Sequence, residues 1–218
     1  MLDRELFPDS ARFCWVKTEI GANDLTNYNG LHPLEKALVS HALDVRKAEF
    51  GDARWCAHRA LEQLGIDTGM PILRGERGMP LLPPTVSGSL THTVGFRAAV
   101  IAPSLLVRSM GLDAEPIAAL PEGVLESIAR DGELPQLKKL TDEGVQSADL
   151  LLFCAKEATY KAWFPLTRRW LGFDQAEIDL RRDGTFVSYL LVRPTPVPFI
   201  SGRWAMRDGY VIATTAVT

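Results

Sequence analysis

AEIDLRRDGTFVSYLLV (Ala176–Val192) and GRWAMRDGYVIATT (Gly202–Thr215) decide the fold class of this chain. In each stretch, two runs rich in apolar, β-branched or aromatic residues flank an Asp-Gly dipeptide. This dipeptide is typical of a two-residue hairpin turn, because both of its residues tolerate positive φ angles. The end of the chain is therefore predicted to form an antiparallel meander of β-strands.

A long helix is predicted directly before the meander, from about Asp149 to Phe164, and Pro165 is expected to end it. The earlier chain repeats the mixture of helix and strand, after an irregular segment over residues 1–32. One helix is predicted to begin near Pro33, and a second is predicted from Gly51 to Leu64. Strands are predicted at Val86–His92, Phe96–Ala102 and Leu106–Ala114, and a short helix at Gly123–Arg130. This repeated mixture favours an α+β fold with two halves, residues 1–105 and 106–218.

The composition argues against several classes of protein. Of the 218 residues, 46% are hydrophobic and 23% are charged, which suits a folded core and excludes wholesale disorder. The net charge is −3, so we expect no nucleic-acid partner that is bound through bulk positive charge. The three cysteines are widely spaced, and the sequence has neither a signal-peptide pattern nor an apolar run of about 20 residues. These features predict a soluble cytoplasmic protein without membrane contact.

Two acidic residues stand two positions apart in the segment Gly111–Pro116. On a strand, the side chains of Asp113 and Glu115 point to the same face, about 6–7 Å apart, where they repel each other. A hard divalent cation such as Mg²⁺ relieves this repulsion and keeps ligand positions for phosphate oxygens. The alternative is a strand end that leaves the sheet with both acids in solvent.

The segment Phe153–Trp163 places three charged residues on a helix that is otherwise largely apolar. Glu157 and Lys161 are four residues apart and share one helix face, and Lys156 lies one step round from Glu157. One interpretation is an exposed ion pair, which stabilises a helix by about 0.3–0.5 kcal/mol. The other is a functional group, because charged residues on a buried helix are uncommon unless they are paired or functional.

Candidate phosphate-binding residues lie upstream of both segments. The segment Gly88–Thr93 combines a glycine, hydroxyl groups and His92. Arginine suits bidentate contact with phosphate, although surface arginines are common, and four stand here: Arg46, Arg54, Arg74 and Arg77. The sequence thus offers acidic residues for a metal ion and basic residues for phosphate, but no nucleophile motif. This combination indicates phosphoryl chemistry that works through positioning and electrostatics.

Taken in order, these segments resemble the 4′-phosphopantetheinyl transferases of the surfactin/enterobactin type. The G-x-D-x-E segment of that family matches Gly111–Glu115, and its [W/F]-x-x-K-E-x-x-x-K segment matches Phe153–Lys161. The upstream G-S-x-T-H segment matches Gly88–His92, and the arginine-bearing stretch before it matches Arg46–Phe50. The resemblance covers about residues 35 to 215 and implies two pseudo-symmetric α+β halves with coenzyme A in the cleft between them.

The resemblance also implies a reaction and a set of residue roles. Phosphopantetheine would move from coenzyme A to a serine hydroxyl of an acyl or peptidyl carrier protein, with release of adenosine 3′,5′-bisphosphate. The implied ligands of Mg²⁺, or of Mn²⁺ in its place, are Asp113, Glu115 and Glu157. Glu157 is also the implied base for the serine, and Lys156 and Lys161 would contact phosphate oxygens. The implied coenzyme A contacts are Arg46, Arg54, Arg74, Thr91, His92, Lys156 and Lys161.

Carrier recognition and the competing hypotheses stay open on the sequence. A candidate docking patch for the carrier combines aromatic residues and arginines, namely Trp163, Arg168, Arg169 and Trp170. The alternative is that the tryptophans belong to the core and the arginines are simply solvated. Carriers of polyketide, fatty-acid, non-ribosomal peptide and siderophore synthesis all fit.

A monomer is expected, because one chain supplies both walls of the cleft. The competing hypotheses are a metal-dependent phosphohydrolase and a non-catalytic coenzyme A-binding regulator or scaffold subunit.

Overall fold

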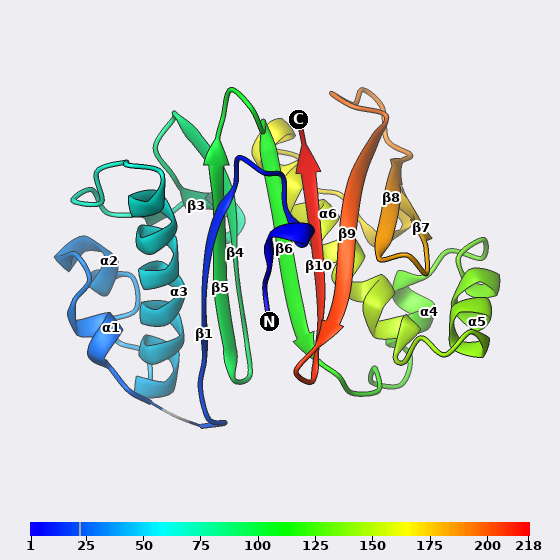
Figure 1. Ribbon diagram of the computed structural model, residues 1–218, viewed down its shortest axis with the longest axis horizontal. Coiled ribbons are helices and arrows are strands. Elements are labelled where there is room, and N and C mark those ends of the chain that lie inside the picture. The colour runs from blue at the N-terminus through cyan, green and yellow to red at the C-terminus, as the bar shows by residue number, and fades with distance from the viewer. Residues whose placement is uncertain (22) are drawn as a thin grey trace.

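The computed structural model describes residues 1–21 and 23–218 and contains two antiparallel sheets that lie edge to edge (Figure 1). The first sheet has the strand order β1-β5-β4, and the second has the order β6-β10-β9-β8-β7. The strands are β1 (Arg12–Lys17), β4 (Val86–Thr93), β5 (Phe96–Pro103), β6 (Ser109–Pro116), β7 (Ala176–Leu180), β8 (Thr185–Leu190), β9 (Phe199–Arg207) and β10 (Tyr210–Val217). With the helices that cover the sheets, they confirm the predicted α+β class.

One 20-residue helix covers each sheet. Helix α3 (Asp44–Gln63) packs on β1 and β5, and α6 (Ala148–Thr167) packs on β6 and β10, behind which it lies in Figure 1. Short helices flank each long one: α1 (Thr26–Asn29), α2 (Pro33–Ala37), α4 (Val124–Ile128) and α5 (Leu134–Asp142). Each half of the chain therefore combines one antiparallel sheet with one long helix.

Strands β4 and β6 bring the two halves together (Figure 1). The backbone N–H of Leu112 on β6 donates to Ser89 Oγ on β4 at 3.0 Å. Beside this contact, Phe96 of the first sheet and Met110 and Ile212 of the second belong to one buried apolar cluster. Removal of this shared surface from water holds the halves together, because apolar burial is the main favourable term in folding.

One of the two Asp-Gly dipeptides forms the predicted two-residue hairpin turn. Asp208 and Gly209 have φ angles of 52° and 87° and connect β9 to β10. The prediction of a two-residue turn is wrong at Asp183-Gly184, because residues 181–184 connect β7 to β8 and only Gly184 of this pair has a positive φ angle, of 84°. Glycine adopts this left-handed region without the clash that a Cβ atom causes, so local turn chemistry fixes the meander.

The structure corrects three boundaries. The prediction of an irregular segment over residues 1–32 is wrong at β1, because this strand pairs with β5 along its whole length. Helix α3 begins at Asp44 rather than Gly51, and α2 ends at Ala37, since the periodic Leu38 is exposed instead of facing a core. Helix α6 continues through Pro165 to Thr167, because a proline in the last turn removes only one hydrogen bond.

A small hairpin, β2 (Leu73–Arg74) and β3 (Pro80–Leu81), projects from the first half. At its tip, Arg77 adopts the left-handed region with a φ angle of 50°. This β2–β3 hairpin matters for the site, because its tip residues line the cavities described below. No helix in the described part of the chain is long and apolar enough to cross a membrane.

Candidate active site

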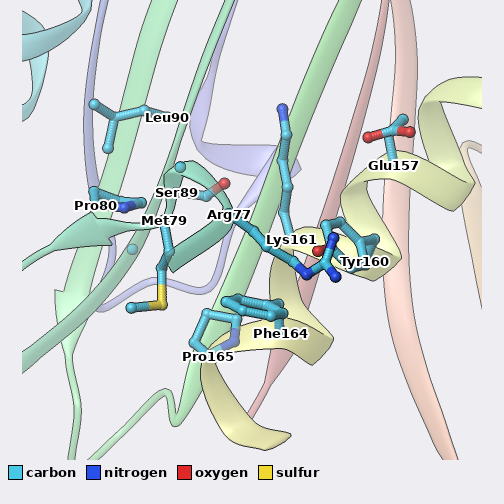
Figure 2. Close-up of a pocket in the computed structure, with 12 residues that line it drawn as sticks. Arg77, Met79, Pro80, Ser89, Leu90, Glu157, Tyr160, Lys161, Phe164 and Pro165 are labelled. Carbon is cyan, nitrogen blue, oxygen red and sulfur yellow. The ribbon is translucent and has the colours of Figure 1, made fainter. Parts of the chain in front are cut away.

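Two adjoining cavities lie where β4, α6 and the β2–β3 hairpin meet. The first, the helix cavity, has a volume of about 230 Å³ and takes Glu157 and Lys161 from α6 (Figure 2). The second, the arginine cavity, has a volume of about 250 Å³ and takes Arg46 and Arg54 from α3. Lys161 and Leu90 line both cavities, so the two adjoin and form a cleft to which both halves contribute.

Three carboxylates predicted to act together do converge beside the helix cavity. Asp113 and Glu115 alternate along β6, and Glu157 lies on α6, which packs on that strand. Burial raises the pKa of Glu157, and the negative charges of Asp113 and Glu115 add to the shift against the opposing charge of Lys161. Burial likewise raises the pKa of Glu115, although a 2.7 Å hydrogen bond from Thr93 Oγ1 favours its charged form.

Lys161 supplies the positive charge that these acids lack. Its Nζ atom lies 2.7 Å from Asp113 Oδ1 and also donates to Leu112 O at 2.9 Å. A third contact reaches Thr91 Oγ1 at 3.3 Å, and this hydroxyl lies 3.4 Å from the same Asp113 oxygen. Lys161 therefore contacts Asp113 and Thr91 and also lines both cavities.

The donor set fits a hard divalent cation. Asp113 Oδ2 is buried and has no hydrogen-bond partner among the residues that the structure describes, so its lone pairs are free for a ligand. Carboxylate oxygens are the ligands that Mg²⁺ prefers. Over residues 1–21 and 23–218, however, no three acidic, thiol or imidazole side chains are already close enough together to hold a metal ion. Binding would therefore require side-chain movement that brings the carboxylates closer together.

The arginine cavity gathers three predicted phosphate ligands: Arg46, Arg54 and Arg74. Arg54 is only 6% exposed, and its guanidinium lies 4.7 Å from the centre of the Phe50 ring. Burial lowers the pKa of Arg54 to about 10; Glu35 opposes this shift, while Arg74 and Arg46 add to it. The Nε atom of Arg54 receives no hydrogen-bond partner from the described residues. A cluster of arginines with one buried member and an unused donor is suited to an anion.

His92 lines the same cavity from β4. Its side chain reaches solvent, but protein atoms of the concave wall replace much of the surrounding water. This desolvation, with a contribution from Arg46, lowers the pKa of His92 to about 4. The imidazole is therefore neutral at pH 7 and offers one N–H donor toward the cavity.

The structure corrects the prediction for Lys156. Its side chain is 1% exposed, and Nζ pairs with Glu133 Oε2 at 2.8 Å. The same nitrogen donates to Phe173 O at 2.7 Å and to Ala176 O at 3.0 Å. All three donors of the ammonium group are thus used inside the protein, so Lys156 does not point a donor at phosphate. It connects α6 to the loop before β7.

We expect Lys156→Met to destabilise the fold and to leave coenzyme A binding unchanged. The substitution leaves the Glu133 carboxylate buried without its cation, which costs about 3 kcal/mol. Urea unfolding measures the loss, and calorimetric titration with coenzyme A measures the affinity. Lys138→Met, which removes an exposed lysine from α5, is the matched control and should change neither quantity. A large loss of coenzyme A affinity in a folded Lys156→Met protein would contradict the structural role.

The candidate docking patch divides into core and surface. Trp163 is fully buried, and its Nε1 donates to Arg169 O at 3.0 Å, so its proposed place on the surface is wrong. The guanidinium of Arg169 lies over the Trp163 ring and donates to Pro194 O. Trp170 is 58% exposed, and Arg168 reaches the β2–β3 hairpin through Met79. Only Arg168 and Trp170 thus stand at the mouth of the cleft.

The sequence does not assign Tyr160 to the cleft, whereas Arg77, one of the four candidate arginines, does line the helix cavity. Tyr160 lines the helix cavity (Figure 2). Its ring centre lies 5.0 Å from that of Trp170. Arg77 reaches across from the β2–β3 hairpin, and its guanidinium lies 5.0 Å from the same Trp170 ring. The only sequence signal for Tyr160 is its position three residues after Glu157 on one helix face.

Comparisons with known proteins agree with this geometry. The 4′-phosphopantetheinyl transferase N-terminal domain matches residues 34–102, and the 4′-phosphopantetheinyl transferase superfamily matches residues 109–215. The 4′-phosphopantetheinyl transferase Npt of Nocardia iowensis is 45% identical over 199 residues, covering 85% of this chain and 88% of the relative. The 4′-phosphopantetheinyl transferase PptT of Mycobacterium tuberculosis is 44% identical over 195 residues, covering 84% and 85%.

A third relative is 4′-phosphopantetheinyl transferase Svp of Streptomyces mobaraensis, 41% identical over 213 residues, which cover 93% of this chain and 86% of the relative. Together, the two family matches span most of both halves of the chain. They also include the segments that carry the carboxylates, Lys161 and the arginines. The chain therefore belongs to the 4′-phosphopantetheinyl transferase superfamily.

Proposed function

We propose that the protein transfers the 4′-phosphopantetheine group of coenzyme A to a serine of an apo carrier protein or carrier domain. The observation that carries this proposal is a pair of adjoining cavities that share Lys161, with three arginines on one side and Glu157, near Asp113 and Glu115, on the other. Coenzyme A has the matching order of groups, with a 3′-phosphate at one end and a pyrophosphate before the pantetheine arm.

The arginine cavity is the proposed site of the 3′-phosphate. Arg46, Arg54 and Arg74 offer charged donors, and neutral His92 offers one more. Lys161 lines both cavities, and its side chain is 27% exposed, unlike that of Lys156. Its ammonium group would contact the pyrophosphate oxygens by exchanging the long 3.3 Å contact to Thr91 Oγ1 for a phosphate oxygen. Thr91 holds Lys161 from β4 and so has an orienting role.

Glu157 is the proposed base. Its pKa is raised by burial, which makes the carboxylate a stronger proton acceptor than an exposed glutamate. The serine oxygen forms a bond to the β-phosphorus of coenzyme A, its proton goes to Glu157, and the bond from that phosphorus to the bridging oxygen breaks. Adenosine 3′,5′-bisphosphate leaves with the bridging oxygen, and Lys161 neutralises the charge that develops there.

Asp113, Glu115 and Glu157 are the proposed ligands of Mg²⁺, with Mn²⁺ as the alternative. A bound divalent cation would polarise the pyrophosphate and neutralise charge on its oxygens. This assignment is supported by the buried Oδ2 atom of Asp113, which has no hydrogen-bond partner among the described residues. We further propose that residues 1–105 and 106–218 are the two structural halves and that a monomer suffices, since both walls of the cleft belong to one chain.

The proposed carrier-docking surface surrounds the mouth of the cleft and is formed by Arg77, Arg168 and Trp170. An exposed tryptophan beside arginines is typical of the residues that dominate protein interfaces. Positive charge there suits an acidic carrier surface. The acyl and peptidyl carriers of fatty-acid, polyketide, non-ribosomal peptide and siderophore synthesis are all candidate substrates.

Mass spectrometry of the carrier tests the proposal. The protein is mixed with coenzyme A, Mg²⁺ and an apo carrier, and the carrier is expected to gain one phosphopantetheine group. The adduct should disappear with Asp113→Ala. Hydrolysis of coenzyme A without a carrier adduct would favour the phosphohydrolase instead, and tight binding of coenzyme A without turnover would favour a regulator or scaffold.

His92 gives an expected pH dependence. Desolvation depresses its pKa to about 4, below the ordinary 6.5, so the free protein keeps this imidazole neutral over that whole interval. The folded state therefore loses stability from this group as the pH falls from about 6.5 to 4, because the unfolded chain binds the proton more readily. A bound phosphate favours the protonated form and should raise the pKa. NMR titration of the His92 ring with and without adenosine 3′,5′-bisphosphate measures both values; an unchanged pKa would place the phosphate elsewhere.

A further inference from the structure

Glu35 is a fully buried carboxylate behind the arginine cavity. It lies on α2, where its Oε2 accepts a 3.2 Å hydrogen bond from the backbone N–H of His32. Its Oε1 accepts a 3.0 Å hydrogen bond from the backbone N–H of Ile72 and lies 2.9 Å from His58 Nε2 on α3. One side chain thus connects three segments that are distant in the sequence.

Each of these three segments carries residues of the arginine cavity. Helix α3 carries Arg54 one turn before His58, on the same helix face. Ile72 stands two residues before Arg74, at the start of the β2–β3 hairpin. Leu38, which follows α2, lines the cavity as well. The position of Arg54 relative to Arg74 therefore depends on Glu35.

The charge of Glu35 also acts on the cavity. Its carboxylate favours the charged form of Arg54, while burial, Arg74 and Arg46 disfavour it. The pKa of Glu35 itself lies below its ordinary value, because the contacts with His58, Ile72 and His32 outweigh the effect of burial. An ionised carboxylate is therefore present behind a cluster of arginines whose mutual repulsion it reduces.

We propose that Glu35 is a positioning residue that holds Arg54 and Arg74 at the spacing a 3′-phosphate requires, and so sets the preference for ligands that carry this group. The inference rests on the proposed function in one respect, the assignment of the arginine cavity to the 3′-phosphate. Glu35 touches no part of the ligand in this role, since its oxygens are used by His32, His58 and Ile72.

The second half of the chain contains a matched residue for the control. Glu133 is also fully buried, and its Oε2 accepts from the backbone N–H of Arg130, three residues earlier, at 2.7 Å. Its Oε1 accepts from Ile178 N at 2.7 Å, and Lys156 of α6 supplies the cation. Glu133 thus repeats the contacts of Glu35 but lies outside the arginine cavity, so its loss costs stability without a direct effect on a 3′-phosphate.

The test compares two ligands that differ in the 3′-phosphate alone. Adenosine 3′,5′-bisphosphate and adenosine 5′-monophosphate are titrated by calorimetry into the wild-type protein, Glu35→Gln, Glu133→Gln and Arg54→Ala. Glu35→Gln is expected to reduce the preference for the bisphosphate about tenfold, the size of one charge-assisted hydrogen bond. Glu133→Gln should keep the wild-type preference, and Arg54→Ala should lose most of it.

The outcomes separate the inference from the proposed function. An unchanged preference in Glu35→Gln, with a reduced one in Arg54→Ala, overturns the role of Glu35 alone. An unchanged preference in both variants overturns the phosphate assignment and with it the inference. A failure of the wild-type protein to modify any carrier overturns the transfer reaction but not the binding result. If Glu35→Gln does not fold, His58→Phe is used instead, because it removes one contact to Glu35 from the partly exposed side. This variant should reduce the preference for the bisphosphate about threefold. An unchanged preference would overturn the inference.

Discussion

Glu157→Gln is expected to lower the rate of phosphopantetheine transfer about 10³-fold and to leave the affinity for adenosine 3′,5′-bisphosphate unchanged. The amide cannot accept the serine proton, and general-base catalysis contributes about 10²–10⁴-fold to such reactions. It also removes one of the three charges that converge on the Asp113 side of the cleft. The arginine cavity, which holds the proposed phosphate site, does not include Glu157.

Single-turnover kinetics with saturating coenzyme A measure the transfer step, and calorimetry measures binding. Glu62→Gln is the matched control, because Glu62 is an exposed residue of α3 that pairs with Arg59 far from the acids. This control should keep the wild-type rate. A Glu157→Gln protein with near wild-type turnover would remove Glu157 from both of its proposed roles, as base and as metal ligand.

Gly111→Ala is expected to destabilise the protein by about 4–5 kcal/mol, in the tail of single-substitution effects. A Cβ atom at this position would lie 1.8 Å from the backbone oxygen of Ala158 and 2.6 Å from Thr215 Oγ1. Backbone on a packed helix has no rotamer by which to move away, so α6 would have to separate from β6. For a chain of this size, the melting temperature should fall by about 10–15 °C.

Thermal and urea unfolding measure this effect, and Gly30→Ala is its control. A Cβ at Gly30 meets only ordinary contacts at 3.7 Å, and its φ angle of −78° suits alanine. A Gly111→Ala protein of normal stability would mean that α6 does not pack as closely on β6 as described. Because Asp113, Glu115 and Glu157 meet across this same contact, a surviving variant should also lose activity.

The fold follows from the sequence where local chemistry decides it. The meander is predicted correctly because turn residues such as Asp208-Gly209 act locally and need no distant partner. The length of the β7–β8 turn is predicted wrongly. Strand β1 is missed because its six residues form a strand only through pairing with β5, about 80 positions later in the chain. Likewise, the start of α3 depends on which residues are buried, and the apolar period that suggests an earlier helix contains the exposed Leu38.

The site shows the same division. Asp113 and Lys161 are singled out from the motifs, but their 2.7 Å contact is known only from the structure. Lys156 is next to Glu157 in the sequence, but one helical step turns it by about 100°, away from the cleft and toward Glu133. Neither Glu133 nor Glu35 stands near a motif, so a sequence reading has no means of assigning their buried contacts.

Lys161 gives the cleft a counterion that is part of the chain. The ammonium group, held by Asp113, Leu112 and Thr91, offsets the charge of the acids before any ion arrives. Small zinc domains behave differently, since their folding free energy comes from the metal and chelators denature them. In this protein the proposed metal ligands already have a counterion within the chain, so we expect folding to be independent of the metal. A chelator is then expected to stop the proposed transfer reaction reversibly and to leave the free energy of unfolding unchanged.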